Sequence, residues 1–427
     1  MREGPIADNV SKPAVKSSIA NFWLFLSFVV LVAPIMLWIL PAKPIADELI
    51  HLPQIQSFMA GSMVLNGIVA MPPGFHLTIA SIANLLGLQE LRELRVINAA
   101  ITLICPLLFW MYLASEKSKL PTLRSTQILL SPIIWPFFFL LYTDLSSLLL
   151  ILAGMVLIER RHFKIAVLVC TFSLTFRQNN IFWTALIWLF AMGDSFSISS
   201  LLEDRKSSFN DFLMKIVPAL KKTFLFVTPL IAFAIFVFLN GGVAMGNKDL
   251  HQASGLYPTQ VFFCLLVFWL VLLPLHINNL GSIFALLKAR PWLILLLAAL
   301  GVAYHLSFDI SHPYNFPSDY FVRNWVLYKL KDHQYWRLIA FIPMAWTLLS
   351  LIVTSLEKRS YYWLYPITLA SLLPVHLIEQ RYYIIPLVLL MLFRVPMSKK
   401  WESILLIWTI LLSTLVSYGI ISMKIFL

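Results

Sequence analysis

Long apolar segments separated by short polar ones recur along the whole chain. Runs of about 20 apolar residues, the length at which a helix crosses the hydrocarbon core of a bilayer, begin near residues 21, 96, 126, 145, 165, 181, 223, 259, 292, 337, 361, 381 and 401. The pattern predicts an all-α polytopic membrane protein with about 13 transmembrane helices. The stretch 73–88 is a further possible span, which we interpret as a juxtamembrane helix, because every loop then obeys the positive-inside rule.

The distribution of basic residues predicts the orientation. Most of the 32 lysines and arginines fall on the side of the N-terminus, which places that terminus in the cytosol and the C-terminus outside. We therefore predict one integral membrane domain, 1–427, with four notable parts. These are a cytosolic tail 1–20, a catalytic outer loop 41–95 that carries juxtamembrane helices, a cytosolic connector 193–222 and an outer loop 309–336.

Composition excludes a soluble protein. Hydrophobic residues make up 60% of the chain and charged residues 12%, and the mean hydropathy is +0.83. The net charge of +12 lies in interhelical loops, so it reports topology and not nucleic-acid binding. The three cysteines each sit inside an apolar segment and are expected to be small buried hydrophobes.

The first outer loop holds the densest polar chemistry, in the stretch 45–56. Its polar side chains are two adjacent carboxylates, an imidazole and two amides: Asp47, Glu48, His51, Gln54 and Gln56. The spacing predicts a short amphipathic helix at the membrane surface, with Asp47 at its N-cap. Two interpretations stay open: Asp47 is a general base at the mouth of a cavity, or it simply caps the helix.

A second polar turn follows a later span. Arg177, Gln178 and Asn179 occupy a tight outer turn whose geometry needs no charge, and a guanidinium with amides suits a phosphate oxygen or sugar hydroxyls. The stretch 240–248 resembles a phosphate loop but lacks its Lys-Ser/Thr ending, so we interpret it as a glycine-rich turn that allows close backbone approach.

Four further cations can be interpreted from their positions. Arg323 and Lys329 lie in the loop 309–336 among aromatic residues, which suits a sugar and a phosphate or an interfacial aromatic belt. Arg381 is either a ligand contact or the structural partner of Glu379. Arg95 is interpreted as an interfacial, snorkelling arginine. No Cys/His pair has zinc spacing, so we expect no metal and no cofactor.

Several of these stretches resemble motifs of the Die2-type dolichyl-phosphate-glucose-dependent α-1,2-glucosyltransferases. Residues 47–56 resemble the family's Asp-Glu-Ile-Phe-His-Ile-Pro-Gln-Ala-Gln signature, and residues 176–181 resemble its Phe-Arg-Gln-Thr-Asn-Ile. Asn240-Gly241-Gly242 and residues 381–386 are similar to two later motifs, in the same order. The loop 312–325 departs from the family, because an Arg-His pair is missing; Arg323 is the candidate substitute.

The resemblance implies a GT-C glycosyltransferase fold with its active site at the outer face. It implies an inverting transfer of a hexose, glucose in α-1,2 linkage, from a polyprenyl (dolichyl) phosphate sugar to a lipid-linked oligosaccharide in N-glycan precursor assembly. Asp47 would be the catalytic base, and Glu48, His51, Gln54 and Gln56 would support it or bind the acceptor. The donor phosphate and sugar would contact a set of polar residues: Arg177, Gln178, Asn179, Arg323, Lys329 and Arg381.

The expected partners are the two lipid-linked substrates and membrane lipids. The site would be lumenal in the endoplasmic reticulum of a eukaryote, or periplasmic or extracellular in a bacterium. A GT-C transferase with another polyprenyl-phosphate sugar and a bacterial glycan or lipid acceptor is one alternative. A lipid or sugar transporter or flippase is another, although such proteins carry ionisable residues near the bilayer midplane, and few are found here. A non-catalytic assembly subunit is a third.

Overall fold

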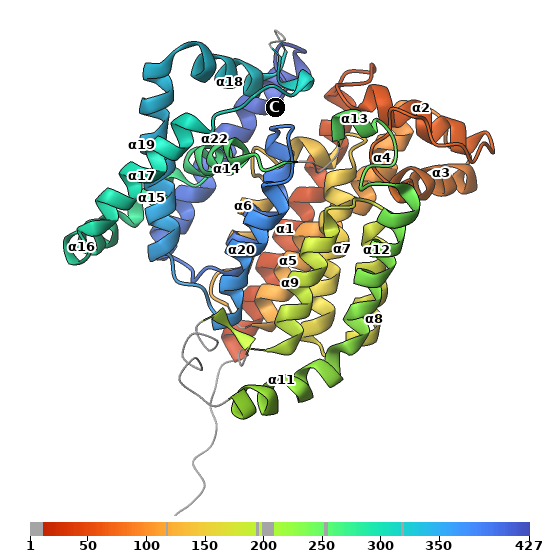
Figure 1. Ribbon diagram of the computed structural model, residues 1–427. Helices are drawn as coiled ribbons and strands as arrows, with labels where there is room; N and C mark the ends of the chain where they lie inside the picture. The colour runs from red at the N-terminus through yellow and green to blue at the C-terminus, as the bar shows by residue number, and fades with distance from the viewer. Residues whose placement is uncertain (1–11, 117, 194–195, 199–208, 252–254, 317–319) are drawn as a thin grey trace, which may run out of the picture.

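The computed structural model describes residues 12–116, 118–193, 196–198, 209–251, 255–316 and 320–427 (Figure 1). The helices in the first half are α1 (Lys12–Ile39), α2 (Glu48–Met59), α3 (Gly74–Leu86), α4 (Leu91–Thr102), α5 (Ile104–Ser115), α6 (Pro121–Leu129), η1 (Trp135–Phe138), α7 (Thr143–Glu159), α8 (Phe163–Leu174), α9 (Asn180–Met192) and α11 (Phe209–Thr223). Residues 1–11 of the predicted tail and 199–208 of the predicted connector lie outside the described residues.

The second half continues the helical pattern. Its elements are η4 (Phe224–Phe226), α12 (Val227–Asn240), α13 (Lys248–His251), α14 (Pro258–Val271), α15 (Leu273–Asn278), α16 (Leu280–Ala289), α17 (Trp292–Leu306), η5 (Pro313–Asn315), α18 (Val322–Asp332), α19 (Gln334–Val353), η6 (Arg359–Trp363), α20 (Leu364–Leu372), η7 (Gln380–Tyr383), α21 (Ile384–Phe393) and α22 (Lys399–Ile421). Two isolated bridges are the β-pairing found within the described ranges.

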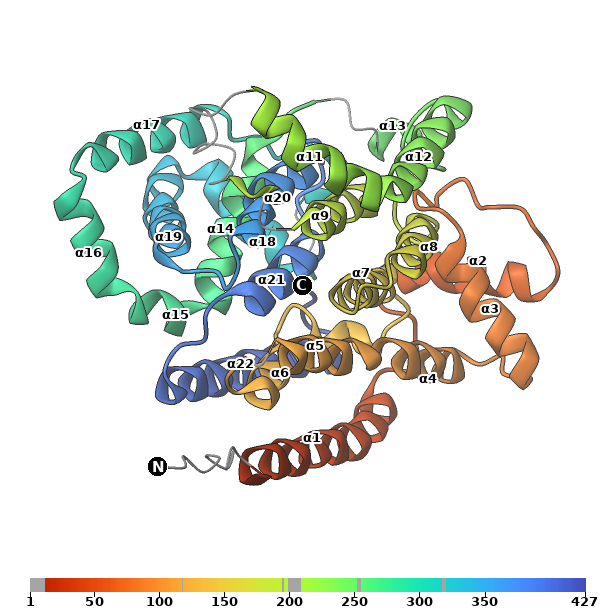
Figure 2. The ribbon, with the colours of Figure 1, turned by 90° about the horizontal axis from the view of Figure 1, so that it is seen from below.

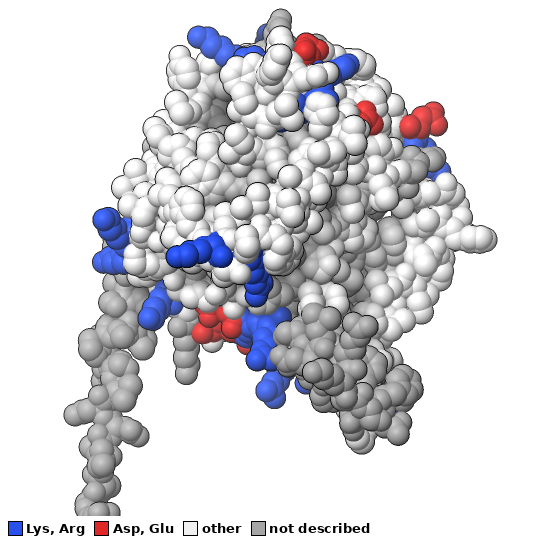
Figure 3. All heavy atoms as spheres, turned by 60° about the vertical axis from the view of Figure 1, so that its left-hand side comes forward, with Lys and Arg blue, Asp and Glu red and all other residues white. Residues whose placement is uncertain are grey.

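The helices confirm an all-α integral membrane protein. Within the described residues, four helical stretches are long and apolar enough to cross a membrane. They are Leu91–Ser115 (α4 with α5), Ile216–Asn240 (the end of α11 with η4 and α12), Gln334–Val353 (α19) and Lys399–Ile421 (α22). α16 and α17 together make a fifth candidate, bent by 106°. Several other predicted spans are shorter apolar helices, so the number of about 13 crossings stays a prediction. Figure 3 shows charged side chains near two ends of the visible face, with an uncharged belt between them.

The segment predicted as a transmembrane helix near residue 126 is not a continuous helix. α6 ends at Leu129, and the chain then runs through irregular backbone and the short η1 before α7 begins. Pro132 and Pro136 lack the N–H that a continuous helix needs. Residues 127–148 are all buried, so this apolar run lies inside the protein. Non-helical backbone at membrane depth is tolerated where protein surrounds it.

α2 and α3 lie across one corner of the molecule, crosswise to the long helices α7 and α8 (Figure 1). They pack on one another and on α4 around a core separate from the main one, which includes Ile55, Phe75 and Leu94. α3 has 13 residues, about 20 Å of helix at 1.5 Å per residue, which is short of a bilayer's hydrocarbon core. Its length and position fit the juxtamembrane interpretation.

α21 is the innermost helix. All ten of its residues are buried, and Figure 2 shows it in the middle of the molecule, with α20, α9 and α22 around it. Its inner end is held by Arg124, which donates to the backbone oxygens of Met391 (2.5 Å) and Arg394 (3.0 Å). Its outer end follows directly on η7, so the buried α21 fixes the position of the η7 residues, Arg381 among them.

Candidate active site

Asp47 stands at the start of α2, as the sequence predicted, but its side chain does not cap the helix. The residue has helical φ and ψ of −66° and −12°, with no cap hydrogen bond. Its carboxylate instead pairs with the guanidinium of Arg381 at 2.7 Å and is 31% exposed. Its backbone N–H donates to the hydroxyl of Tyr142 (3.0 Å). The simple capping interpretation of Asp47 therefore has no support in this geometry.

Glu48 fixes the turn that precedes Asp47. Its carboxylate accepts from Arg95 through Nε (2.9 Å) and Nη2 (2.5 Å), and from the backbone N–H groups of Ile45 and Leu141 (both 2.9 Å). Glu48 and Arg95 are both fully buried. The interpretation of Arg95 as a snorkelling cation was wrong, because a buried carboxylate 47 positions away draws it inward. Glu48 thus holds the backbone turn that positions Asp47.

His51 lies beneath Asp47 and is neutral. Its Nδ1 is 3.0 Å from Nε2 of His76, and its ring packs edge-on against Tyr142. Burial, followed by the positive charges of Arg381 and Arg177, lowers the pKa of His51 to about 3. A ring with so low a basicity is a poor proton acceptor at neutral pH, which leaves Asp47 as the better base.

The two glutamines of the α2 motif have different positions. The side chain of Gln54 is buried and holds the following loop, since its amide donates to Val64 O (3.2 Å) and accepts from Asn66 N–H (2.7 Å). Gln56 is exposed on the outer side of the helix. Of the two, Gln54 shapes the loop and Gln56 is the one open to a ligand.

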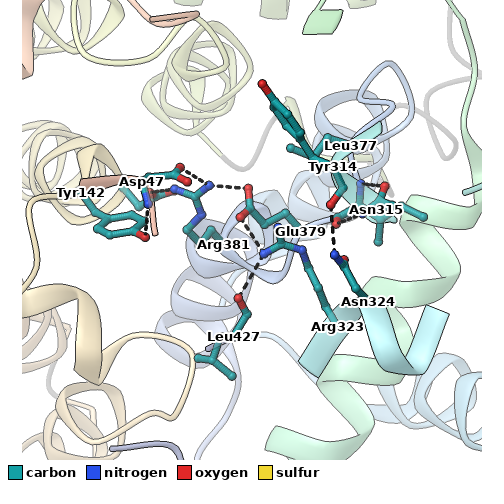
Figure 4. Close-up of polar contacts among 12 residues, drawn as sticks. Asp47, Tyr142, Tyr314, Asn315, Arg323, Asn324, Leu377, Glu379, Arg381 and Leu427 are labelled. Atoms are coloured by element: carbon teal, nitrogen blue, oxygen red, sulfur yellow. Dashed lines mark hydrogen bonds and ion pairs between the residues drawn. The ribbon is translucent and has the colours of Figure 1, made fainter. Parts of the chain in front are cut away.

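Three arginines and three carboxylates, Asp47 among them, form one network, and Figure 4 shows the part made by Asp47, Arg381, Glu379 and Arg323. Arg381 contacts Asp47 at 2.7 Å, Glu379 at 2.5 Å and Asp144 at 3.5 Å. Arg177 pairs with Asp144, and Arg323 pairs with Glu379 at 2.8 Å. Arg381 and both of its other acidic partners are less than a tenth exposed. Asp47 is thus the most exposed acid of the network.

The predicted phosphate ligands separate in the structure. Arg177, Asn179 and Arg381 line a cavity of about 20 Å³ together with Asp144, which is room for about one water molecule. Gln178 instead donates to Ala70 O (2.6 Å) and joins two loops. Arg323 reaches the network, whereas Lys329, on the same helix α18, is exposed. The network therefore gathers three of the four predicted cations.

Several buried polar atoms in or next to this cavity make no hydrogen bond, although Oδ2 of Asp144 lies 3.5 Å from Nη1 of Arg381. Oδ2 of Asp144, Nε of Arg381 and both amide atoms of Gln380 are buried and make no hydrogen bond in the structure. Buried polar groups are normally satisfied. Unsatisfied polar atoms of this kind are expected where a polar ligand or ordered water completes a site.

Three outer loops are joined by backbone hydrogen bonds around the network. Gly246 N–H donates to Val69 O (3.0 Å) and Asn247 N–H donates to Gly67 O (2.7 Å), while Gly74 N–H donates to Thr175 O (2.8 Å). A Cβ at Gly246 would overlap the backbone of Gly67 and Val69. The prediction of a glycine-rich turn that permits close backbone approach is confirmed.

A model of the DIE2/ALG10 family matches residues 41–392. The chain belongs to the DIE2/ALG10 family. The matched region contains all six residues of the charged network. Within the described residues, no group of three or more His, Cys, Asp or Glu side chains is arranged to hold a metal ion.

Curated relatives of the chain share one name, Dol-P-Glc:Glc(2)Man(9)GlcNAc(2)-PP-Dol alpha-1,2-glucosyltransferase. The Arabidopsis thaliana protein is 26% identical over 92% of this chain and 94% of its own length. The Candida albicans protein is 28% identical, covering 71% and 68%, and the Homo sapiens protein is 24% identical, covering 81% and 83%. Among solved structures, apo ArnT from Cupriavidus metallidurans is similar over 92% of this chain and 78% of its own, with 14% identity and a TM-score of 0.39.

Sequence reasoning did not select Asp144 as a member of the site. The residue follows Tyr142 and Thr143 at the start of α7, in a short polar turn between apolar stretches. A carboxylate in such a turn, on the same predicted side as Arg177, was the available signal. Glu379 was noticed only as a partner of Arg381, and the structure gives it a second partner in Arg323.

Proposed function

We propose that this member of the DIE2/ALG10 family is an inverting hexosyltransferase with a GT-C architecture and one membrane domain. It would move glucose from a polyprenyl (dolichyl) phosphate to a lipid-linked oligosaccharide, in α-1,2 linkage, during assembly of the N-glycan precursor. The names of the relatives support this choice of donor and acceptor. The observation that carries the proposal is Asp47: a part-exposed carboxylate at the edge of a buried, arginine-rich network.

The chemistry assigns separate tasks to the acid and the arginines. Asp47 takes the proton of the acceptor hydroxyl while the hydroxyl oxygen bonds to the anomeric carbon. The bond from that carbon to the phosphate oxygen breaks, and the phosphate leaves with the electron pair and one more negative charge. Arg177 and Arg381, which line the cavity beside Asp47, would stabilise that charge, with Arg323 behind them.

Substrate entry would rearrange the ion pairs. Arg381 holds Asp47, Glu379 and Asp144 in the structure, so a donor phosphate competes with these carboxylates for its guanidinium. A phosphate that draws Arg381 toward the cavity loosens its hold on Asp47. The carboxylate of Asp47 is then free to accept a hydrogen bond from the acceptor hydroxyl.

The compartment follows from the same proposal. Use of a dolichyl donor and a lipid-linked oligosaccharide places the protein in the endoplasmic reticulum membrane of a eukaryote, with the network facing the lumen. The departing loop 312–325 supports a second candidate, in which another polyprenyl-phosphate sugar is transferred to a different glycan at the outer face of a bacterial membrane.

The test is a transfer assay with purified protein and a panel of polyprenyl-phosphate hexoses. With dolichyl-phosphate glucose and the diglucosylated lipid-linked oligosaccharide, we expect one added hexose, and Asp47→Asn should abolish it. Asp332→Asn, which changes an exposed carboxylate on α18, should leave transfer unchanged. Near-normal transfer by Asp47→Asn would rule out the proposed base. Transfer only from another donor would favour the second candidate.

A further inference from the structure

The segment 424–427 folds back from the end of α22 toward the active site. Met423 has a φ of +56°, and the N–H groups of Lys424 and Ile425 donate to Gly419 O at 3.0 and 3.3 Å. The turn depends on the glycine, because a Cβ at Gly419 would overlap the side chain of Ile425. The turn therefore sets the direction in which the last residues run.

Phe426 then pairs with the chain beside Arg323. Its N–H donates to Tyr320 O (2.7 Å) and its carbonyl accepts from Val322 N–H (3.0 Å), which forms an isolated parallel bridge. Leu427 O accepts from Nη1 of Arg323 (3.1 Å), as Figure 4 shows. The segment is thus attached to the same arginine that holds Glu379.

The Phe426 ring lies between two tyrosines. It stacks on Tyr320, with ring centroids 5.8 Å apart, and on Tyr142, with centroids 6.1 Å apart. Only 2% of Phe426 is exposed. A buried aromatic stack of this kind resists displacement, because both the apolar area and the ring–ring contacts would be lost.

Tyr142 passes this constraint directly to the Asp47–Arg381 pair. Its hydroxyl accepts the backbone N–H of Asp47 (3.0 Å), and its ring lies 4.9 Å from the guanidinium carbon of Arg381. One aromatic ring therefore contacts both members of the ion pair and is itself held by Phe426. A shift of Phe426 would move the base and its counter-ion relative to one another.

We propose that Phe426 is a positioning residue for the transfer reaction, acting through Tyr142 on Asp47 and Arg381. This inference rests on the proposed function for its effect on activity. The Phe426 side chain is buried, so it is not open to contact with either substrate. Its loss should therefore lower kcat, with little change in the KM for the donor. A misplacement of reacting groups by about 1 Å can reduce a rate on the order of 100-fold.

Two variants test the proposal from different positions. Phe426→Ala removes the ring, and Gly419→Ala displaces the segment 424–427 by contact with Ile425. The matched control is Gly281→Ala, the same substitution in α16, where a Cβ meets open space. Each protein should first be shown to be monodisperse, with an unchanged thermal midpoint or with the change recorded.

Two readouts keep the proposal separate from the proposed function. The first is kcat and KM for transfer. The second needs no activity: labelling of Asp47 by a water-soluble carbodiimide and an amine, measured by peptide mass spectrometry. Glu48, in the same peptide and fully buried, is the internal reference. We expect Phe426→Ala and Gly419→Ala to increase labelling of Asp47 relative to Glu48 and to lower kcat by tenfold or more, on the order of the loss expected for misplaced groups.

Each outcome decides the proposal. Wild-type labelling of Asp47 and unchanged kcat in both variants would overturn it. Increased labelling of Asp47 and Glu48 together would also overturn it, since that indicates general unfolding. If the wild-type protein transfers no hexose, the proposed function fails, while the labelling of Asp47 still supports or refutes the positioning role.

Discussion

The buried pair of Glu48 and Arg95 makes the sharpest stability prediction. Glu48 accepts four hydrogen bonds, two from Arg95 and two from backbone N–H groups of Ile45 and Leu141. Removing the carboxylate leaves the guanidinium and both amides buried without that partner. Loss of one member of a buried pair typically destabilises a protein by about 3–5 kcal/mol, so Glu48→Ala should fall in that range.

A double-mutant cycle separates the pair from its surroundings. Glu48→Gln keeps the size of the side chain and loses the charge, and Arg95→Met keeps the apolar stem and loses the guanidinium. Each single change should destabilise the protein, and the double variant should recover much of the loss, because no unpaired buried charge remains. We expect a coupling of about 0.5–3 kcal/mol, the range for residues in direct contact.

The measurement is the free energy of unfolding in mixed detergent micelles, obtained from denaturant titration of the four proteins. Additive effects, with a coupling below about 0.5 kcal/mol, would refute the view that Glu48 and Arg95 stabilise one another. Transfer activity adds a second check. The double variant should stay less active than the wild type even when its stability recovers. The amide that replaces the carboxylate has one oxygen, so one of the two backbone N–H groups, of Ile45 or Leu141, loses its acceptor.

Three further predictions concern other parts of the site. Burial lowers the pKa of His51 to about 3, so the folded state resists a proton that the unfolded state accepts near pH 6.5. The contribution of neutral His51 to the free energy of unfolding should be complete above pH 6.5 and decline toward pH 3, by up to about 1.4 kcal/mol per pH unit. His51→Gln should reduce that slope in acid-unfolding curves. Gly246→Ala should lower thermal stability, because its Cβ overlaps the backbone of residues 67–69, whereas Gly67→Ala has open space and should be neutral; equal midpoints in a thermal scan would contradict the close approach. Arg323→Ala should lower kcat far more than Lys329→Ala, since Arg323 alone of the two reaches the network. Similar losses of kcat in the two variants would indicate that Lys329 also contacts the donor.

The sequence was sufficient for the class of protein and for the centre of the site. Hydrophobic runs of near-constant length predict membrane helices, and the motifs at residues 47, 177 and 381 fall on one predicted face. The structure places these three residues in one ionic network. The distribution of basic residues along the chain predicts which loops lie on the same side of the membrane, and loops on one side can meet.

The sequence pattern could not predict which side chains pair with one another. Arg95 has the spacing of an interfacial residue, and only the return of the chain at Glu48 makes it a buried partner. The stretch 130–142 has the composition of a span, and its irregular backbone depends on two prolines and on complete enclosure by other helices. Both features depend on tertiary packing, because the local sequence pattern does not indicate which distant residues contact a side chain.

The complete enclosure of α21 has a consequence for how the enzyme meets its bilayer. Arg381 lies in η7, which α21 continues inward. Arg124 holds the inner end of α21, and none of the ten residues of α21 is exposed. Helices that touch lipid tilt or stretch their surroundings when the hydrocarbon thickness changes. The exposed helices, such as α16, α17 and α19, can absorb such changes, while the position of Arg381 is set by protein alone. We therefore expect the Arg381 side of the ion pair with Asp47 to be insulated from membrane thickness, because protein encloses it.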